Sequence, residues 1–176
     1  MTSDSWYLAL LGVVALERLA ELVVTTRNAR WSFARGGVES GRGHYPAMVA
    51  LHVAFLAACA VEVVAGHRPF VPWLGWPMLA LAAAAQVLRW TCIATLGHHW
   101  NARVIVVPGA PLVRSGPYRL LRHPNYVAVV VEFVALPLVH TAWLTALVGS
   151  VLNALVLRTR IRVENAALAA GTSVAA

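Results

Sequence analysis

The sequence predicts an all-α integral membrane protein, a single bundle of five transmembrane helices. Composition is the first observation: the 176 residues are 60% hydrophobic and 12% charged, whereas a soluble domain is about 45–50% apolar and about 25% charged. The second is a series of five apolar runs, most of them close in length to a membrane crossing. The third is that most arginines lie between these runs. At this length we expect one membrane domain over residues 1–176.

Five apolar runs divide the chain, and each is a candidate membrane helix because about 20 apolar residues cross the hydrocarbon core. The expected spans cover residues 6–25, 46–65, 73–96, 126–139 and 142–157. The first three form an N-terminal half, 1–96, and segment 97–168 completes the domain. Only His140 and Thr141 separate the last two spans, which predicts a helical hairpin. The glycine-rich loop 26–45 is expected to have irregular backbone.

The arginines predict the orientation of the chain, because positive residues collect on the cytoplasmic side of a membrane protein. With five spans, eleven of the fourteen arginines fall on one side; the chain has no lysine. They are Arg27, Arg30, Arg35, Arg42, Arg103, Arg114, Arg119, Arg122, Arg158, Arg160 and Arg162. We therefore expect the N-terminus outside and the C-terminus in the cytoplasm. The arginine- and alanine-rich composition hints at a bacterial gene, and hence at a bacterial inner membrane.

The net charge of +7 suggests lipid and anionic small molecules as partners. The arginines flank apolar runs, where they contact phosphate or carboxylate groups at the membrane surface. A nucleic-acid partner is therefore not expected. The sequence leaves the oligomeric state open.

Ionisable residues inside a span are costly in lipid and face a partner or a wet cavity. Glu17, Arg18 and Glu21 in the first span fit a structural ion-pair cluster and a functional group equally well. His52 in the second span fits a buried core histidine, and Arg89 in the third fits an anchor at the membrane interface. Other polar residues inside the spans are Glu62, Gln86, Glu132 and Asn153.

The sequence disfavours several kinds of site. No Cys/His/Asp set has metal-ligand spacing, and the pair His98–His99 alone is a weak sign of zinc, so no metal site is expected. Cys59 and Cys92 lie in apolar runs, where cysteine behaves as an inert small hydrophobe. There is no nucleotide-binding glycine loop and no nucleophile-elbow serine motif.

Charged residues crowd one membrane boundary. The stretch "GPYRLLRHPNY", residues 116–126, brings Arg119, Arg122 and His123 directly before the fourth span. Arg160 and Glu164, four residues apart, lie where the fifth span leaves the membrane on the same side. So many charges at one boundary of a small bundle predict a cytoplasmic pocket.

These residues carry a resemblance. "GPYRLLRHPNY", a short helical hairpin and "RIRVENAAL" together resemble the isoprenylcysteine carboxyl methyltransferase superfamily, whose pattern is G-x-Y-x-x-x-R-H-P-x-Y, two membrane helices, then R-x-x-x-E-E. The first part is filled by Gly116, Tyr118, Arg122, His123, Pro124 and Tyr126. The second part is filled by Arg160 and Glu164, with Asn165 in place of the second glutamate. The resemblance covers residues 90–168.

The N-terminal half is similar to a narrower bacterial branch of that superfamily, through "ERLAEL", "RNARW" and "RGGVESGRGHYPAMVALH". That branch accompanies type III polyketide synthases and O-methylates alkylpyrones or alkylresorcinols. The implied acceptor is therefore a small lipophilic molecule of that kind, or an isoprenylcysteine-like carboxylate.

The resemblance implies S-adenosyl-L-methionine as the cofactor. The implied cofactor-binding residues are His98, Gly116, Tyr118, Arg122, His123, Pro124 and Tyr126. Arg122 and His123 suit the cofactor carboxylate, and Tyr118 and Tyr126 suit the purine or the sulfonium. Pro124 begins the next helix at the position that proline prefers. Which of His98, His99 and Asn101 contacts the cofactor stays open.

The expected catalytic pair is Arg160 and Glu164. Arg160 would orient or stabilise the acceptor oxygen. Glu164 would hold Arg160 or take the proton of a hydroxyl acceptor. Glu132, Asn153 and His52 are expected to bind the acceptor.

Two other functions fit parts of the pattern. Sterol reductases resemble the same C-terminal region but use NADPH, and they usually have more than five spans. A non-catalytic lipid-binding protein could also hold buried ion pairs, although no packing rule requires the G-x-Y-x-x-x-R-H-P-x-Y spacing.

Overall fold

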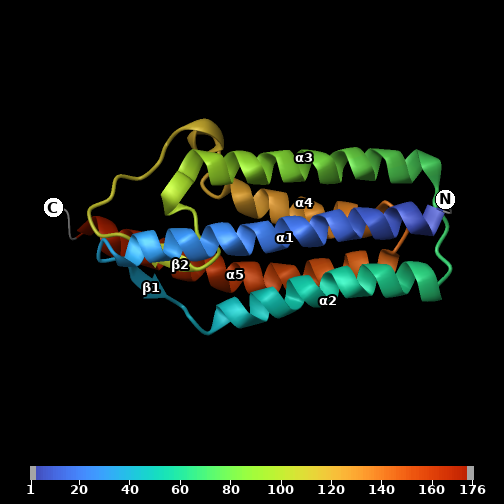
Figure 1. Ribbon diagram of the computed structural model, residues 1–176, viewed down its shortest axis with the longest axis horizontal. Helices are drawn as coiled ribbons and strands as arrows, with labels where there is room; N and C mark the ends of the chain where they lie inside the picture. Colours follow the sequence, from blue (N-terminus) through green and yellow to red (C-terminus); the bar gives the residue numbers. More distant parts are fainter. Residues whose placement is uncertain (1–2, 174–176) are drawn as a thin grey trace.

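Five helices run side by side along the long axis of the computed structural model, which describes residues 3–173 (Figure 1). The helices are α1 (Ser3–Phe33), α2 (His44–Ala65), α3 (Pro72–Leu96), α4 (Pro124–Leu138) and α5 (Trp143–Ser173). The connections hold two short 3-10 helices, η1 (Gly97–His99) and η2 (Gly116–Arg119), and two strands, β1 (Val38–Ser40) and β2 (Val104–Val106). The start of α1 and the end of α5 lie at opposite ends of the bundle (Figure 1). The all-α bundle predicted from the sequence is confirmed.

Three helices follow the expected spans closely: α2, α3 and α4 begin and end within two residues of them. The helical hairpin is also present. Thr141 adopts a left-handed backbone conformation with a φ of 53°. The Ala142 amide donates to the Pro137 carbonyl at 3.0 Å, and this turn reverses the chain between α4 and α5.

The other two helices extend beyond their apolar runs. α1 continues to Phe33 and α5 to Ser173, so the irregular backbone expected for loop 26–45 is wrong for residues 26–33. An apolar run measures the part of a helix that faces lipid. A helix can continue past that boundary with polar residues, and both of these do so at the end that carries most arginines.

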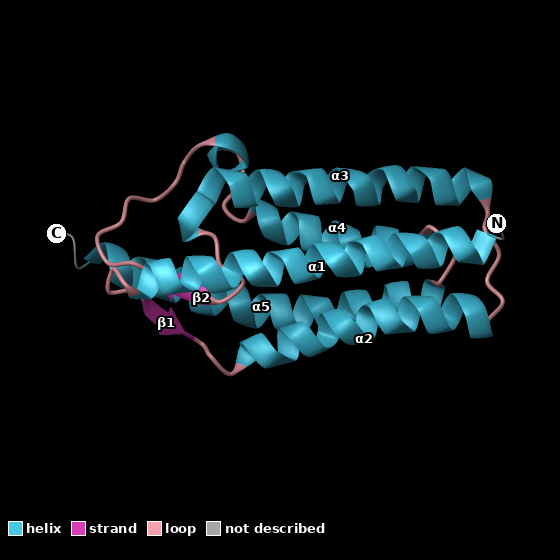
Figure 2. Ribbon diagram, in the orientation of Figure 1, coloured by secondary structure: helices cyan, strands magenta, loops and turns pink. Residues whose placement is uncertain are grey.

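A two-stranded antiparallel sheet joins the two long connections at that end (Figure 2). Strand β1 pairs with β2 in the register Val38↔Val106, Glu39↔Ile105 and Ser40↔Val104. The sequence analysis did not predict this pairing, because each strand has three residues and shows no alternating pattern.

Helix α4 is the centre of the bundle and packs against α3 and α5. Its Phe133 is fully buried and stacks on Phe55 of α2, with ring centroids 4.0 Å apart. The Tyr7 hydroxyl of α1 donates to the Leu136 carbonyl of α4 at 3.1 Å. Helix α4 is the shortest of the five α-helices, and these contacts explain why it is also the most buried.

By length and composition, three helical segments among the described residues can cross a membrane: His44–Ala65, Pro72–His99 and Trp143–Ala170. Helix α4 is apolar but shorter. Helix α1 is not in that group, and it carries the expected charged cluster in its middle. The protein is thus an integral membrane protein, while five crossings and their orientation stay predictions.

The charges of α1 are neutralised inside the bundle by α3 and α4. Arg18 pairs with Glu21 at 3.0 Å and lies 3.6 Å from Glu132. Arg89 pairs with Glu132 at 2.5 Å and lies 3.5 Å from Glu21. Arg89 is only 4% exposed, so its expected position as an interface anchor is wrong: its charge is needed by two buried carboxylates.

Candidate cofactor site

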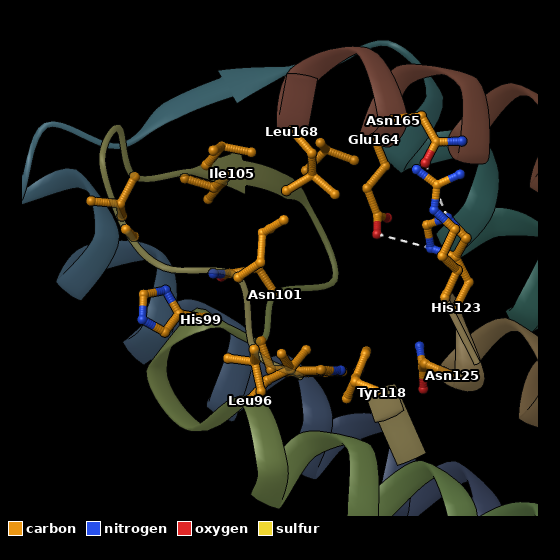
Figure 3. Close-up of a pocket in the computed structure, with 18 of the residues that line it drawn as sticks. Leu96, His99, Asn101, Ile105, Tyr118, His123, Asn125, Glu164, Asn165 and Leu168 are labelled. Atoms are coloured by element: carbon orange, nitrogen blue, oxygen red, sulfur yellow. Dashed lines mark hydrogen bonds and ion pairs between the residues drawn. The ribbon is translucent and has the colours of Figure 1, made fainter. Parts of the chain in front are cut away.

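A cavity of about 730 Å³ lies at the end of the bundle that carries the small sheet. Its walls are the end of α3, the segments 99–107 and 110–119, the start of α4 and the far end of α5 (Figure 3). Pockets for small molecules and cofactors usually measure about 300–1,000 Å³. The size therefore suits a cofactor.

The local sequence explains how the "GPYRLLRHPNY" stretch forms one wall. Gly116 has a φ of 52°, and an added Cβ would lie 2.9 Å from the Thr95 hydroxyl oxygen of α3, so only glycine turns the chain there without strain. Pro124 starts α4 at its first position as expected. Between them, Tyr118 and His123 face the cavity (Figure 3).

A chain of hydrogen bonds crosses from α5 to α4 and back. Arg160 donates through Nε to the Tyr126 hydroxyl at 2.8 Å, and that hydroxyl donates to Oε2 of Glu164. His123 Nδ1 lies 3.3 Å from Oε1 of Glu164. The expected pair of Arg160 and Glu164 is therefore linked through Tyr126, and both oxygens of Glu164 have partners.

His123 lies between a carboxylate and an amide. Its Nε2 is 3.1 Å from Oδ1 of Asn165, the residue that replaces the family's second glutamate. The hydrogen bond to Glu164 raises the pKa of His123 above its ordinary value, against the opposing effect of burial. A protonated His123 donates to both neighbours, so a neutral amide at position 165 suits a site that already has one carboxylate.

Arg160 is a buried cation that lines the cavity, and it is 6% exposed. Its Nη1 donates to the Ala102 carbonyl, and its Nη2 lies 3.4 Å from the Asn101 carbonyl. No carboxylate of residues 3–173 lies within 4.0 Å of its nitrogens. A desolvated guanidinium with neutral partners attracts an anion or a developing negative charge.

Other polar groups of the cavity wall have no partner among the described residues. Oδ1 of Asn101 and Oδ1 of Asn125 are buried without a hydrogen bond. Three lining arginines, Arg114, Arg119 and Arg122, make no ion pair within the part of the chain that the structure describes. Buried polar atoms normally have partners, so this wall is chemically suited to a bound molecule with both donors and an anionic group.

The structure brings most of the expected cofactor residues together, with exceptions. His98 is exposed and stacks on Trp31 with ring centroids 5.2 Å apart, outside the cavity lining, whereas His99 and Asn101 do line it. Gly116 and Pro124 shape the backbone rather than the lining. The structure therefore favours His99 and Asn101 over His98.

The three expected acceptor residues lie deeper in the bundle, outside the cavity lining. Glu132 is 3% exposed and paired with Arg89. Asn153 is 2% exposed. His52 donates through Nδ1 to the Met48 carbonyl at 2.8 Å and packs edge-to-face with Phe133, as a core histidine does. A role for these three in acceptor binding stays a prediction.

Sequence reasoning missed one contributor. Asn125 faces the cavity from the variable position of the H-P-x-Y pattern (Figure 3), and a family pattern gives no signal at such a position. The segment 98–107 was expected to form part of the cofactor wall, and its strand β2 does line the cavity. Only its pairing with β1 was not predicted.

The fold and the site define a class: a helical integral membrane protein with a cofactor-sized, arginine-rich cavity at one end of its bundle. The isoprenylcysteine carboxyl methyltransferase (ICMT) family profile matches residues 78–170, and the chain belongs to that family of membrane methyltransferases. The match includes the whole of α4, most of α3 and α5, and the cavity wall between them.

Two bacterial proteins are similar over nearly the full chain. The uncharacterized protein YpbQ of Bacillus subtilis (strain 168) is 35% identical over 160 residues, which cover 90% of this chain and 94% of that protein. An uncharacterized protein of Haemophilus influenzae (strain ATCC 51907 / DSM 11121 / KW20 / Rd) is 28% identical over 154 residues, 86% of this chain and 88% of that protein. Both similarities extend beyond the family match, into α1 and α2.

Proposed function

We propose that this protein is an S-adenosyl-L-methionine-dependent methyltransferase that acts on a small lipophilic acceptor at the cytoplasmic face of a bacterial inner membrane. The observation that carries the proposal is Arg160, a buried cation that lines a cofactor-sized cavity and has no carboxylate of the described residues within 4.0 Å. Membership of the family supports methyl transfer as the reaction class.

The residues of the cavity fit this cofactor. The lining arginines that form no ion pair with the described residues, Arg119 and Arg122 among them, suit its carboxylate, which a guanidinium binds with two parallel hydrogen bonds. The free amide oxygens of Asn101 and Asn125 suit its ammonium and its adenine amino group, because both of these groups donate hydrogen bonds.

When bound, S-adenosyl-L-methionine supplies an electrophilic methyl group for in-line displacement, a reaction in which positioning provides much of the rate. Arg160 stabilises the negative charge of the acceptor oxygen. Tyr126 fixes the guanidinium through Nε and passes the proton of a hydroxyl acceptor to Glu164. An acceptor carboxylate needs no such proton transfer, and for it Glu164 only orients Tyr126.

The acceptor that we favour is an alkylpyrone or alkylresorcinol, with an isoprenylcysteine-like carboxylate as the alternative. A molecule with an alkyl chain reaches the cavity from the bilayer, and its polar head needs the cation of Arg160. Radiolabelled methyl transfer from S-adenosylmethionine to a long-chain alkylpyrone, an alkylresorcinol and farnesylcysteine would separate these classes.

Calorimetric titration in detergent tests the cofactor. We expect saturable binding of S-adenosylmethionine and S-adenosylhomocysteine and none of NADPH. Arg122→Ala should weaken binding at least tenfold, as the loss of a charge-assisted pair predicts. The matched control is Arg158→Ala, because Arg158 is an exposed residue of α5 that lies outside the cavity lining.

Two results would contradict the proposal. Binding of NADPH alone would indicate a membrane reductase of the sterol reductase type. Binding of none of the three, by protein that elutes as a folded species, would indicate a non-catalytic lipid-binding protein.

A further inference from the structure

The strip of residues 97–102 connects α3 to β2 and consists of η1 and three residues of irregular backbone. His99, Trp100 and Asn101 of this strip line the cavity. Two of its carbonyls, those of Asn101 and Ala102, accept hydrogen bonds from Arg160. Within the strip itself one backbone bond is present, from the Trp100 amide to the Gly97 carbonyl at 3.2 Å. Something outside the strip must therefore hold these carbonyls in place.

Helix α1 provides that support. Nδ2 of Asn28 donates to the carbonyls of Gly97 at 3.0 Å and Trp100 at 2.7 Å. The hydroxyl oxygen of Thr25 accepts from the Ala102 amide at 2.5 Å. Ala102 thus contacts Thr25 through its amide and Arg160 through its carbonyl.

The three contacting residues share one buried face of α1. Thr25, Asn28 and Ser32 are 3%, 6% and 1% exposed, and their spacing of three and four residues repeats the helical turn. Ser32 lies at 3.5 Å from Nδ2 of Asn101. A polar stripe buried this completely, with every contact directed at one strip, is not needed for packing an apolar bundle.

We infer that the stripe Thr25–Asn28–Ser32 of α1 is a positioning element of the methyltransferase site, which holds strip 97–102 and through it the Arg160 guanidinium. The inference rests on the proposed function for its catalytic consequence. It also extends the site to a helix outside the matched family region, which begins at residue 78. These are positioning residues, because they act through backbone groups and do not line the cavity.

The test compares Thr25→Val with Thr26→Val in the full chain in detergent. Both remove one hydroxyl oxygen from adjacent positions, but Thr26 is exposed and bonds only the Leu22 carbonyl of its own helix. Two properties are measured: hydrogen exchange of peptides covering 97–103, and calorimetric binding of S-adenosylhomocysteine.

We expect Thr25→Val to speed exchange in 97–103 and to weaken S-adenosylhomocysteine binding roughly tenfold, since the Ala102 amide is left buried and unpaired. Thr25→Ser restores the acceptor oxygen and should restore both properties. A purely structural effect would lower thermal stability without this rescue of affinity. If Thr25→Val does not fold, the same two measurements compare Asn28→Ala with Thr26→Ala as its control.

Unchanged exchange in 97–103 for Thr25→Val, relative to Thr26→Val, would overturn the inference. The inference would also be overturned if the wild type binds S-adenosylhomocysteine and Thr25→Val shows faster exchange in 97–103 but the same affinity as the wild type. If the wild type binds no S-adenosylhomocysteine, the proposed function fails. Faster exchange in Thr25→Val would still show that α1 holds the strip in place.

Discussion

Two arginines of nearly equal burial have opposite electrostatic surroundings. Arg89 is paired with Glu132 and lies close to Glu21, so its charge is cancelled inside the bundle. Arg160 is held by a phenol and two backbone carbonyls, all neutral. Because a buried charge needs compensation, Arg89 stabilises the fold, whereas Arg160 has the role that we propose for it, attracting the anionic part of a bound molecule.

The hydroxyl of Tyr126 is the single atom that joins Arg160 to Glu164, so Tyr126→Phe should separate them. The ring, which stacks on His123 with centroids 5.2 Å apart, is kept. Hydrogen bonds to charged groups contribute about 1.5–3 kcal/mol, which corresponds to a roughly ten- to hundredfold lower kcat. Labelled methyl transfer measures this change, and calorimetry should show a smaller effect on S-adenosylhomocysteine binding.

Tyr45→Phe is the control for that experiment, since Tyr45 lies in the first turn of α2 and does not line the cavity. Equal turnover for Tyr126→Phe and Tyr45→Phe would remove the hydroxyl link from the proposed mechanism.

The raised pKa of His123 predicts a pH dependence of stability. Its protonated form is favoured in the fold by Glu164, so its contribution is fully present below the unfolded pKa of about 6.5. That contribution is lost as the pH rises through the higher pKa of the folded state. We expect the Tm of the wild type to fall across this window and His123→Gln to flatten the fall.

His67→Asn is the comparison for the pH series. His67 is exposed in a turn with a φ of 48°, a conformation that asparagine tolerates. A fall in Tm that persists unchanged in His123→Gln would show that another group titrates.

At the scale of elements, the small sheet holds one wall of the cavity through a buried carboxylate. Glu39 of β1 accepts from Arg103 at 2.7 Å and 2.6 Å, a bidentate pair beside β2. Its side chain is only 2% exposed, whereas its other partner, Arg42, is 77% exposed. The two ion pairs of Glu39, one with Arg103 and one with Arg42, therefore differ mainly in how exposed the arginine is.

Glu39→Gln should lower the free energy of unfolding by about 1–3 kcal/mol, because Arg103 loses a charged partner. Arg42→Gln removes the exposed arm and should cost less than about 1 kcal/mol. Denaturant unfolding in detergent compares the two, and hydrogen exchange in 103–107 locates the change. A larger effect for Arg42→Gln would contradict the assignment of the stabilising pair.

At the scale of the whole molecule, the network of Arg18, Glu21, Arg89 and Glu132 ties α1, α3 and α4 together in the middle of the bundle. Breaking a buried pair leaves an uncompensated charge, so Glu132→Gln should destabilise the protein by about 3–5 kcal/mol. Glu17→Gln is the matched control, since Glu17 is 27% exposed and 3.9 Å from Arg18, and it should cost about 0–1 kcal/mol.

Thermal unfolding in detergent gives both values. Equal small losses for Glu132→Gln and Glu17→Gln would mean that lipid or water, rather than the ion network, compensates these charges. In that case Glu132 would again be free for the predicted contact with the acceptor.

The lengths of the apolar runs predicted the ends of α2, α3 and α4 to within two residues, because lipid selects a continuous apolar surface of fixed thickness. The same criterion ended α1 and α5 too early, since a helix outside the membrane needs no apolar run. For the site, the family pattern named Tyr118, Arg122, His123, Tyr126, Arg160 and Glu164, all of which line the cavity. It could not give the role of Tyr126 as the link between Arg160 and Glu164, because that contact joins two helices.

The sequence by itself determined that the chain is a membrane bundle, which boundary carries the charges, and six of the residues that line the cavity. These properties follow from composition, run length and local spacing, which are written along the chain. Tertiary structure alone decided that Arg89 pairs directly with buried carboxylates while Arg160 reaches Glu164 only through Tyr126, that β1 pairs with β2, and that α1 contacts strip 97–102. Each of these depends on residues far apart in sequence, whose approach is set by how the helices pack.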